Sequence, residues 1–375
     1  MKKILCILAM LGAAVSCIYS YEPDIETDEA AGFLVVDGEI ILGGTSVIKL
    51  GRITPITGDI LSAPTGTAWV ESDDGARYES TGAPSSSIEI PTVTAVLGHD
   101  YRAHILVDGE EYVSEWLTPK PAPEIQAIDF DATDNMVHVL VTMNGGEEGT
   151  GFIGLTFEET WEFHSDFEAE YIINPETWTF LPMTGEYPYY WCWRSARSKD
   201  MTLVEYANLR SGQINRRNVY SFSRYNNRNH KKYSIVVQAR TLSEEAYDYR
   251  RYIQDLSETG GDLFTPEPGT MKGNLHCETN EELHVVGLVN AAILSSKRAF
   301  MGATYLLERT ADESILTLID PTQMPYYYNT LNYRPVKDIT RDEVKGVGWG
   351  PERCINCIVA GGTQEKPDFW DDAKI

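Results

Sequence analysis

Six cysteines are the residues of this 375-residue chain whose type and spacing could do chemistry. Cys354 and Cys357 have a Cys-x-x-Cys spacing, which suits a redox pair, part of a zinc site or a structural disulfide. A redox pair needs a helix N-terminus to stabilise its thiolate. Pro351 precedes the motif and Gly361 follows it, so no helix is indicated. Zinc would need four thiolates, or a histidine, to converge. We therefore expect a structural disulfide, no metal and no cofactor.

Four cysteines are candidates for disulfide bonds in the mature chain: Cys192, Cys277, Cys354 and Cys357. In an oxidising compartment an even number of cysteines favours disulfides. Four cysteines allow three pairings, and the sequence does not choose among them. A bond from the tail to Cys192 or Cys277 would close a long loop and stabilise the fold by about 2–4 kcal/mol.

Cys17 ends a short apolar run that follows Lys2 and Lys3. The run is shorter than the roughly 20 residues that a membrane-spanning helix needs, and its basic start is typical of a secretory signal peptide. Ala14-Val15-Ser16-Cys17 resembles a bacterial lipobox, although the first position usually holds leucine. We predict a signal peptide over residues 1–16 and lipidation of Cys17 with acyl chains such as palmitate. A plain secreted protein is the alternative.

Residues 17–32 begin at the lipobox cysteine and contain acidic residues but no basic ones. The acids are Glu22, Asp24, Glu26, Asp28 and Glu29. A like-charged stretch without apolar periodicity stays solvated, so we predict a flexible tether. It resembles the surface-export signal of Bacteroidota lipoproteins, and a simple spacer is the alternative. The whole chain has a formal net charge of −25. Such a surface repels phosphate backbones, so nucleic acid is not an expected partner.

Aromatic residues crowd one short run, EYPYYWCWR, where Tyr187, Tyr189 and Tyr190 could contact a sugar, a flat ligand or a partner protein. The alternative is that one side of a strand fills the core and the other covers an edge. We expect Trp191 or Trp193 to face the core.

A second candidate surface is the stretch from Tyr206 to Ser243, which contains no acid. Its bases could meet a carboxylate, a phosphate or an acidic partner loop, because the arginine fork suits such groups. Alternatively, they neutralise the protein's own acids. The candidates are Arg210, Arg216, Arg217, Arg224, Arg228, Lys231 and Lys232.

No catalytic motif is present in the sequence. The seven histidines are scattered, and neither His-Glu-x-x-His nor Gly-x-Ser-x-Gly occurs. The stretch from Asp129 to Asn135 is only loosely like a calcium loop, and turn formation is the simpler interpretation. We expect a protein that is not an enzyme.

The elements that must position these residues are mainly β-strands. From residue 33, short runs of period two separated by Gly, Pro, Ser and Asp predict an immunoglobulin- or fibronectin-like β-sandwich over residues 33–120. Asp74-Gly75 and Asp108-Gly109 predict tight two-residue hairpins. The three prolines of residues 118–123 predict a linker, because proline cannot join a sheet interior.

Residues 121–375 predict a larger β-rich domain with one clear helix near residues 243–259. Ser243 suits the N-cap of this helix and two glycines can end it. Helical spacing predicts a buried face with Ala246, Tyr249, Ile253 and Leu256.

Several segments occur in an order that resembles a known family. They are the lipobox, FLVVDGEI, EETWEF, Cys192-Trp193, YSIVVQA, AYDYRRYIQDLSETGGDLF, PGTMKGNL and PERCINCIVAGGTQEKPDFW. Together they resemble the Bacteroidota outer-membrane lipoproteins called domain of unknown function 4249. The resemblance covers nearly the whole mature chain. It implies an outer-membrane lipoprotein, often encoded beside a TonB-dependent β-barrel receptor, with no assigned activity.

The sequence and the resemblance lead to one functional expectation and one alternative. We expect a lipid-anchored outer-membrane protein, exposed at the cell surface, that serves a TonB-dependent transporter as a non-enzymatic accessory or binds its substrate, an unidentified small ligand. The alternative is a structural or adhesive surface lipoprotein.

Overall fold

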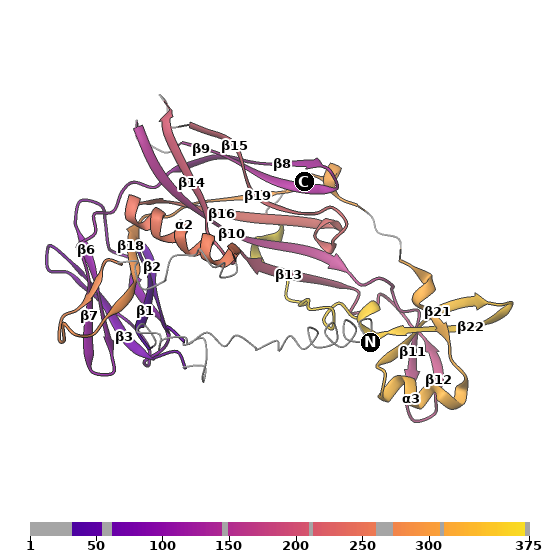
Figure 1. Ribbon diagram of the computed structural model, residues 1–375. Helices are drawn as coiled ribbons and strands as arrows, with labels where there is room; N and C mark the ends of the chain where they lie inside the picture. The colour runs from indigo at the N-terminus through magenta and orange to yellow at the C-terminus, as the bar shows by residue number, and fades with distance from the viewer. Residues whose placement is uncertain are drawn as a thin grey trace, which may run out of the picture.

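The computed structural model describes residues 32–54, 62–144, 149–209, 213–259, 273–307 and 311–371. The predicted signal peptide, Cys17 and Arg210 lie outside this part of the chain. The fold is mainly β, as predicted: two sandwiches and a smaller unit follow one another along the molecule (Figure 1). The predicted β-sandwich at the N-terminal end is confirmed.

The first sandwich packs a four-stranded sheet, β18-β1-β2-β5, against a five-stranded sheet, β17-β7-β6-β3-β4. Alternate residues of the strands fill one shared core, in which Val36, Ile48 and Ile105 are fully buried. The strands are β1 (Leu34–Ile41), β2 (Gly44–Arg52), β3 (Gly66–Ser72), β4 (Arg77–Glu79), β5 (Ser87–Thr92), β6 (Tyr101–Val107), β7 (Glu110–Ser114), β17 (Leu275–Cys277) and β18 (Val285–Ala292).

Two strands of the first sandwich come from far along the chain. β18 pairs in parallel with β1, with Leu34 opposite Val285, and β17 pairs with β7. Each of them forms one edge of its sheet. The predicted division at residue 120 therefore marks where the first run of strands ends, and the sandwich also includes residues 275–292.

The turn residues of two hairpins have the positive φ angles that their residue types favour. Asp108 (φ 53°) and Gly109 (φ 88°) both take positive φ and join β6 to β7, so the predicted two-residue hairpin is confirmed. Asp134 (φ 51°) and Asn135 (φ 62°) form a similar turn. The prediction was wrong for the other hairpin: only Gly75 takes positive φ there, and the turn between β3 and β4 has four residues.

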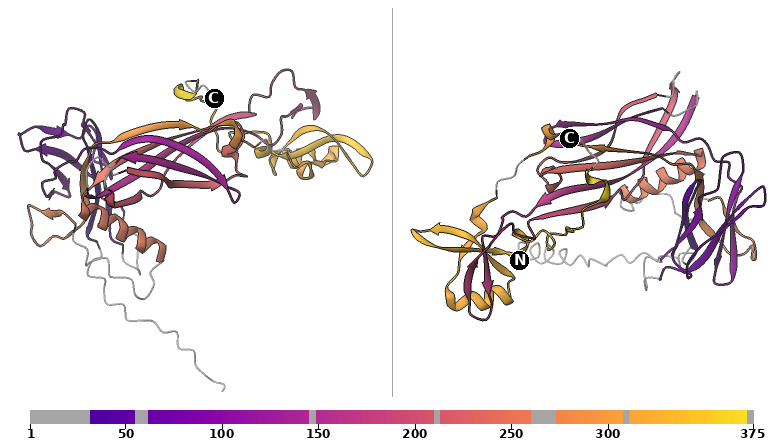
Figure 2. Two further views of the ribbon diagram at one scale, coloured as in Figure 1. Left: turned by 90° about the horizontal axis from the view of Figure 1, so that it is seen from above. Right: turned by 180° about the vertical axis from the view of Figure 1, so that it is seen from behind.

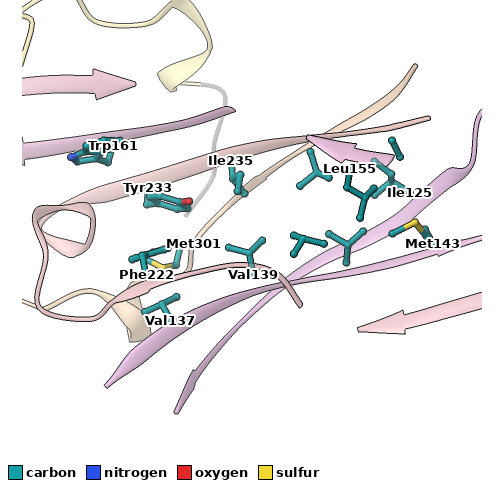
Figure 3. Close-up of a cluster of buried hydrophobic side chains, with 14 of the residues drawn as sticks. Ile125, Val137, Val139, Met143, Leu155, Trp161, Phe222, Tyr233, Ile235 and Met301 are labelled. Carbon is teal, nitrogen blue, oxygen red and sulfur yellow. The ribbon is translucent and has the colours of Figure 1, made fainter. Parts of the chain in front are cut away.

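The larger sandwich packs the sheet β13-β10-β16-β19, with β14 beside β10, against the sheet β15-β9-β8. Figure 3 shows their shared core, where Val139, Tyr233 and Ile235 are fully buried. The strands are β8 (Glu124–Thr133), β9 (Met136–Asn144), β10 (Gly149–His164), β13 (Trp191–Arg197), β14 (Thr202–Leu209), β15 (Gln213–Ser223), β16 (Lys232–Leu242) and β19 (Ser295–Phe300).

The predicted helix is α2 (Glu244–Thr259), and it begins after its predicted N-cap. Ser243 Oγ accepts a hydrogen bond from the backbone N–H of Ala246 at 3.1 Å. Ala246 is buried between the sandwiches beside Leu288 of β18, but Ile253 is 46% exposed, so its predicted burial was wrong. Tyr249 is half-buried against the same cluster, and the side chain of Leu256 lies outside the described residues.

The two sandwiches are also joined by ion pairs from β1. Arg240 of β16 is buried and pairs with Glu39, and Arg250 of α2 lies 3.2 Å from Asp37. Arg240 also donates to Thr156 of β10 at 2.6 Å. These contacts fix the first sandwich against the larger one.

A small unit forms the far end of the molecule, opposite the first sandwich (Figure 2). Its aromatic side chains pack around Trp349, which is fully buried. Its elements are β11 (Tyr171–Asn174), β12 (Thr179–Pro182), β20 (Thr317–Leu318), α3 (Met324–Asn329), β21 (Tyr333–Arg341) and β22 (Val344–Pro351).

Candidate functional site

The two predicted candidate surfaces meet at one end of β10. The ring centroid of His164, the last residue of this strand, lies 5.0 Å from that of Tyr190 and 5.1 Å from that of Trp191. The ring of His230 lies 4.9 Å from the His164 ring on the same measure. Lys231 Nζ lies 5.3 Å from the centroid of Trp191. These five residues are called the aromatic–basic cluster below.

Strand register and one capped turn bring the cluster together. β13 pairs with β10 so that Trp191 lies opposite His164. The 3₁₀ turn η1 (Asn227–Asn229) is capped by the side chain of Asn226. This turn leads the chain into β16 and so places Lys231 beside the same strand end. Residues up to 67 positions apart in the sequence, from His164 to Lys231, therefore share one surface.

The cluster offers recognition chemistry. His164 Nδ1 lies 2.7 Å from the backbone oxygen of Ser165, and because a carbonyl only accepts, Nδ1 must donate. In the neutral ring, Nε2 is then the acceptor. Lys231 is exposed and supplies a positive charge next to half-buried aromatic rings. Rings and an ammonium suit a ligand with a flat or sugar-like face and an anionic group. As far as the described residues go, the cluster contains no cysteine, serine or carboxylate.

A buried polar network lies on the core side of the same strand. Glu159 of β10 is 1% exposed and accepts two hydrogen bonds from Arg228, the Nε–Oε2 bond being 2.8 Å long. Tyr233 Oη donates to it at 3.0 Å and Tyr220 Oη at 3.3 Å. Burial, followed by the charge of Glu159, raises the pKa of Tyr233 well above its ordinary value and also raises the pKa of Tyr220. Both hydroxyls therefore keep their protons and donate.

The other bases of the acid-free stretch do not form one surface with the cluster. Arg216 pairs with Asp129 at 3.3 Å, and Arg217 beside it on β15 is exposed. Arg224 is half-buried, and Lys232 donates to the backbone oxygen of Trp370. Arg228 forms an ion pair with the buried Glu159. Arg216 and Arg228 therefore neutralise the protein's own carboxylates, as the alternative interpretation expects.

The aromatic run divides between core and surface. Tyr187 is half-buried against a small apolar cluster that includes Cys354, and burial raises the pKa of its hydroxyl. Tyr189 is 39% exposed. The expectation that Trp191 or Trp193 faces the core was wrong: the two share the opposite side of β13, and Cys192 between them is fully buried. Trp191 and Trp193 are two residues apart, so they share one side of β13. That side faces away from the core, because the side chain of Cys192 points inward.

Cys192 forms the disulfide, and its partner is Cys357, 165 residues later in the chain. The bond ties the C-terminal tail across β13. The other two candidates, Cys277 and Cys354, are buried free thiols. Burial, followed by the nearby Asp166, raises the pKa of the Cys354 thiol. The Cys-x-x-Cys pair therefore does not close on itself and does not hold a zinc ion with the other cysteines.

Sequence reasoning missed a polar and aromatic face on the first sandwich. His104 of β6 lies between two carboxylates, 2.9 Å from Glu71 and 2.7 Å from Glu111, and stacks on Trp69 with ring centroids 4.7 Å apart. Arg102 donates to Glu71 at 2.8 Å. The sequence did contain a signal for this face. Trp69 and Glu71 alternate with buried residues along β3, and Arg102 and His104 have the same parity on β6, so their side chains share one outer face.

A cavity of about 460 Å³ lies against β17 and the start of β18. Cys277 lines it, together with apolar and histidine side chains. The lining residues are Gly273, Leu275, His276, Cys277, Glu281, Leu283, His284 and Val285. The aromatic–basic cluster does not contribute to this cavity.

No helix in the described ranges is long and apolar enough to cross a membrane. No curated protein matches the chain. Among solved structures, the chain is 10% identical to a candidate carbohydrate binding protein from Bacteroides uniformis ATCC 8492. That match covers 56% of this chain and 91% of the other chain, with a TM-score of 0.17, and carries no argument about fold or ligand.

A family model described as "Domain of unknown function (DUF4249)" matches residues 18–298. The match covers both sandwiches, apart from the last residues of β19. It includes the aromatic–basic cluster and the buried Glu159 network. By this match, the chain belongs to the DUF4249 family.

Proposed function

We propose that this protein is a non-enzymatic lipoprotein of the outer membrane, exposed at the cell surface, that binds a ligand or docks on a TonB-dependent receptor as its accessory. The anchor is proposed from the sequence, in which a short apolar run ends at Cys17 and an acidic stretch follows. The family match begins at residue 18, directly after that cysteine, which is consistent with a mature chain starting there.

The observation that carries the binding role is the aromatic–basic cluster. Lys231 is an exposed cation held beside Trp191 on a chain whose net charge is −25. Aromatic side chains next to a cation are typical of binding surfaces, because they supply contact area and direction for an anionic group. The ion pair of Glu159 with Arg228 fixes the turn that leads into Lys231, so the surface is preorganised.

Co-purification tests the docking role. The mature chain is tagged at its C-terminus, outer membranes are extracted in mild detergent, and bound proteins are identified. A stoichiometric β-barrel receptor would support the accessory role. A lone lipoprotein, with the receptor present in the extract but unbound, would contradict docking and favour the structural or adhesive alternative.

A pair of charge-reversal variants tests the cluster itself. Lys231→Glu should weaken the association with receptor or ligand at least tenfold, because the charge beside Trp191 is inverted. Arg217→Glu is the matched control, since this exposed arginine lies on β15 outside the cluster. Equal effects of the two variants would show that only net charge matters and would contradict a binding role for the cluster.

A further inference from the structure

The cavity of about 460 Å³ lies where the chain passes from one sheet of the first sandwich to the other. β17 belongs to the sheet of β7, whereas β18 belongs to the sheet of β1. Residues 278–284 connect the two strands and are called the crossing segment below. Both strands and the crossing segment line the cavity, whose volume falls within the range of about 300–1,000 Å³ that is usual for small-molecule sites.

The strands supply an apolar floor to the cavity. Cys277 of β17 is 4% exposed, and Leu275 and Val285 pack against the core of the first sandwich. All three residues line the cavity. Such a floor binds the apolar part of a ligand, because contact removes apolar surface from water on both sides.

The two strands that form the floor are fixed to each other. The side chain of Asn274 bonds twice to the backbone of Val289 on β18: Nδ2 donates to the oxygen at 2.7 Å, and Oδ1 accepts from the N–H at 2.9 Å. Gly273 approaches Gly287 so closely that a Cβ on Gly273 would lie 1.5 Å from the backbone oxygen of Gly287. These contacts join the start of β17 to β18, so the floor keeps its shape without a ligand.

A turn in the crossing segment fixes the rim of the cavity. Asn280 Oδ1 accepts from the backbone N–H of Glu282 at 3.0 Å, and the backbone oxygen of Asn280 accepts from the N–H of Leu283 at 3.1 Å. This turn places Glu281 and Leu283 in the cavity lining. Both side chains are exposed, so a ligand can reach them from solvent.

The rim carries negative charge and hydrogen-bond acceptors. The crossing segment contains Glu278, Glu281 and Glu282 but no lysine or arginine. Glu278 lies 3.0 Å from His276, whereas no described residue forms an ion pair with Glu281. In its neutral form, the imidazole of His284, which also lines the cavity, has one accepting nitrogen. The rim therefore suits a cation that donates hydrogen bonds.

The histidine and cysteine side chains of the lining do not form a metal site. In the part of the chain that the structure describes, no three His, Cys, Asp or Glu side chains converge closely enough to hold a metal ion. An organic cation fits instead, because its ammonium group needs one carboxylate and its apolar body covers the floor.

We propose that this cavity binds a small amphipathic amine, a molecule with an apolar body and a primary ammonium group. The body packs on Leu275, Cys277 and Val285, and the ammonium group pairs with Glu281 at the rim. The net charge of −25 attracts cations and repels anions, which adds to this preference. The site lies on the first sandwich, so it is separate from the aromatic–basic cluster of the larger one.

Two fluorescent probes that differ in charge test the site on the mature chain from residue 18. Dansylcadaverine carries an apolar dansyl group and a primary amine, and dansylglycine carries the same group and a carboxylate. Dansylcadaverine should bind saturably with brighter, blue-shifted emission, and dansylglycine should bind about tenfold more weakly or less tightly still. Folded protein that binds neither probe saturably, or that binds dansylglycine as tightly as dansylcadaverine, would overturn the proposal.

A matched pair of glutamate variants tests the assigned carboxylate. Glu281→Gln should weaken the binding of dansylcadaverine about tenfold, because a charge-assisted hydrogen bond is lost. Glu282→Gln removes the same charge from the neighbouring exposed residue, which is not part of the described lining, and should change the affinity by less than about twofold. Equal losses in the two variants would show that only net charge matters and would overturn the proposal.

A second pair of variants tests the place of binding. Leu283→Lys puts a positive charge into the cavity lining and should abolish the binding of dansylcadaverine. Leu331→Lys is the control, because it adds the same charge at an exposed leucine of the small unit and should keep the binding. Binding that survives Leu283→Lys in folded protein would place the probe elsewhere and overturn the proposal.

Discussion

Arg228 and Glu159 form a two-point ion pair inside the larger sandwich, with Arg228 Nε 2.8 Å from Glu159 Oε2. Glu159 belongs to β10, and Arg228 belongs to the turn η1, 69 residues later. The arginine also lies over the ring of Trp161, 4.3 Å from its centroid. The pair therefore fixes the turn that directly precedes His230 and Lys231 against the strand that carries His164.

Glu159→Gln should lower the free energy of unfolding by about 3 kcal/mol, because Arg228 would keep its charge at a largely buried position without a counter-ion. Urea denaturation followed by fluorescence measures this. Asp129→Asn is the control, since it breaks the exposed pair with Arg216 and should cost less than about 1 kcal/mol. Similar losses in both variants would contradict a special role for the buried pair.

Cys357→Ser should lower the free energy of unfolding by about 2–5 kcal/mol, because it opens the loop closed by Cys192. Non-reducing peptide mapping should find the cross-link in the wild type and in Cys354→Ser. In the native state, Cys277 and Cys354 should resist alkylation, because each is 4% exposed, and both should react after denaturation. Loss of the cross-link in Cys354→Ser would contradict this pairing.

Protonation of Glu71 should lower the stability of the fold in acid. The hydrogen bond from Arg102 lowers the pKa of Glu71 below its ordinary value of 4.5, while burial acts in the opposite sense and His104 adds to the lowering. A carboxyl group whose folded pKa is depressed stabilises the fold above its unfolded pKa, and this stabilisation is lost as the pH falls through the folded pKa. Glu71→Gln should therefore reduce the loss of stability between pH 5 and pH 3, measured by urea midpoints. An unchanged loss of stability between pH 5 and pH 3 in Glu71→Gln would contradict this role.

Cys17→Ser should move the protein from the membrane fraction to the soluble or secreted fraction and prevent incorporation of labelled palmitate. The reason is that the proposed lipid is attached to this sulfur. Cys6→Ser is the matched control, because it changes a cysteine within the predicted signal peptide and should leave both readouts unchanged. Membrane retention of the Cys17→Ser variant would contradict the lipid anchor.

Local features of the fold could be predicted from the sequence because their causes are local. Ser243 caps α2 through its own hydroxyl, and Asp108-Gly109 turns because both residues tolerate positive φ. The burial of Ile253 could not be judged in the same way. Helical spacing says which side chains share a face, but not how far along the helix the neighbouring strands extend.

Long-range features had no local signal. Nothing in the sequence of β18 states that it pairs with β1, about 250 residues earlier, because any apolar strand could form that edge. The same holds for the choice of Cys357 over Cys354 as the partner of Cys192. The aromatic–basic cluster combined two stretches that were each predicted as candidates, but only the register of β10 with β13 and β16 shows that they meet.

The strands β17 and β18 complete the first sandwich but lie about 240 residues after its first strand in the sequence, which affects the order of folding during synthesis. Both sheets of the first sandwich lack an edge strand until residues 275–292 have been synthesised. The N-terminal part therefore cannot complete its fold before about three quarters of the chain is made. Until then it has two open strand edges that can pair with other chains, so folding of the first sandwich should depend on protection from aggregation.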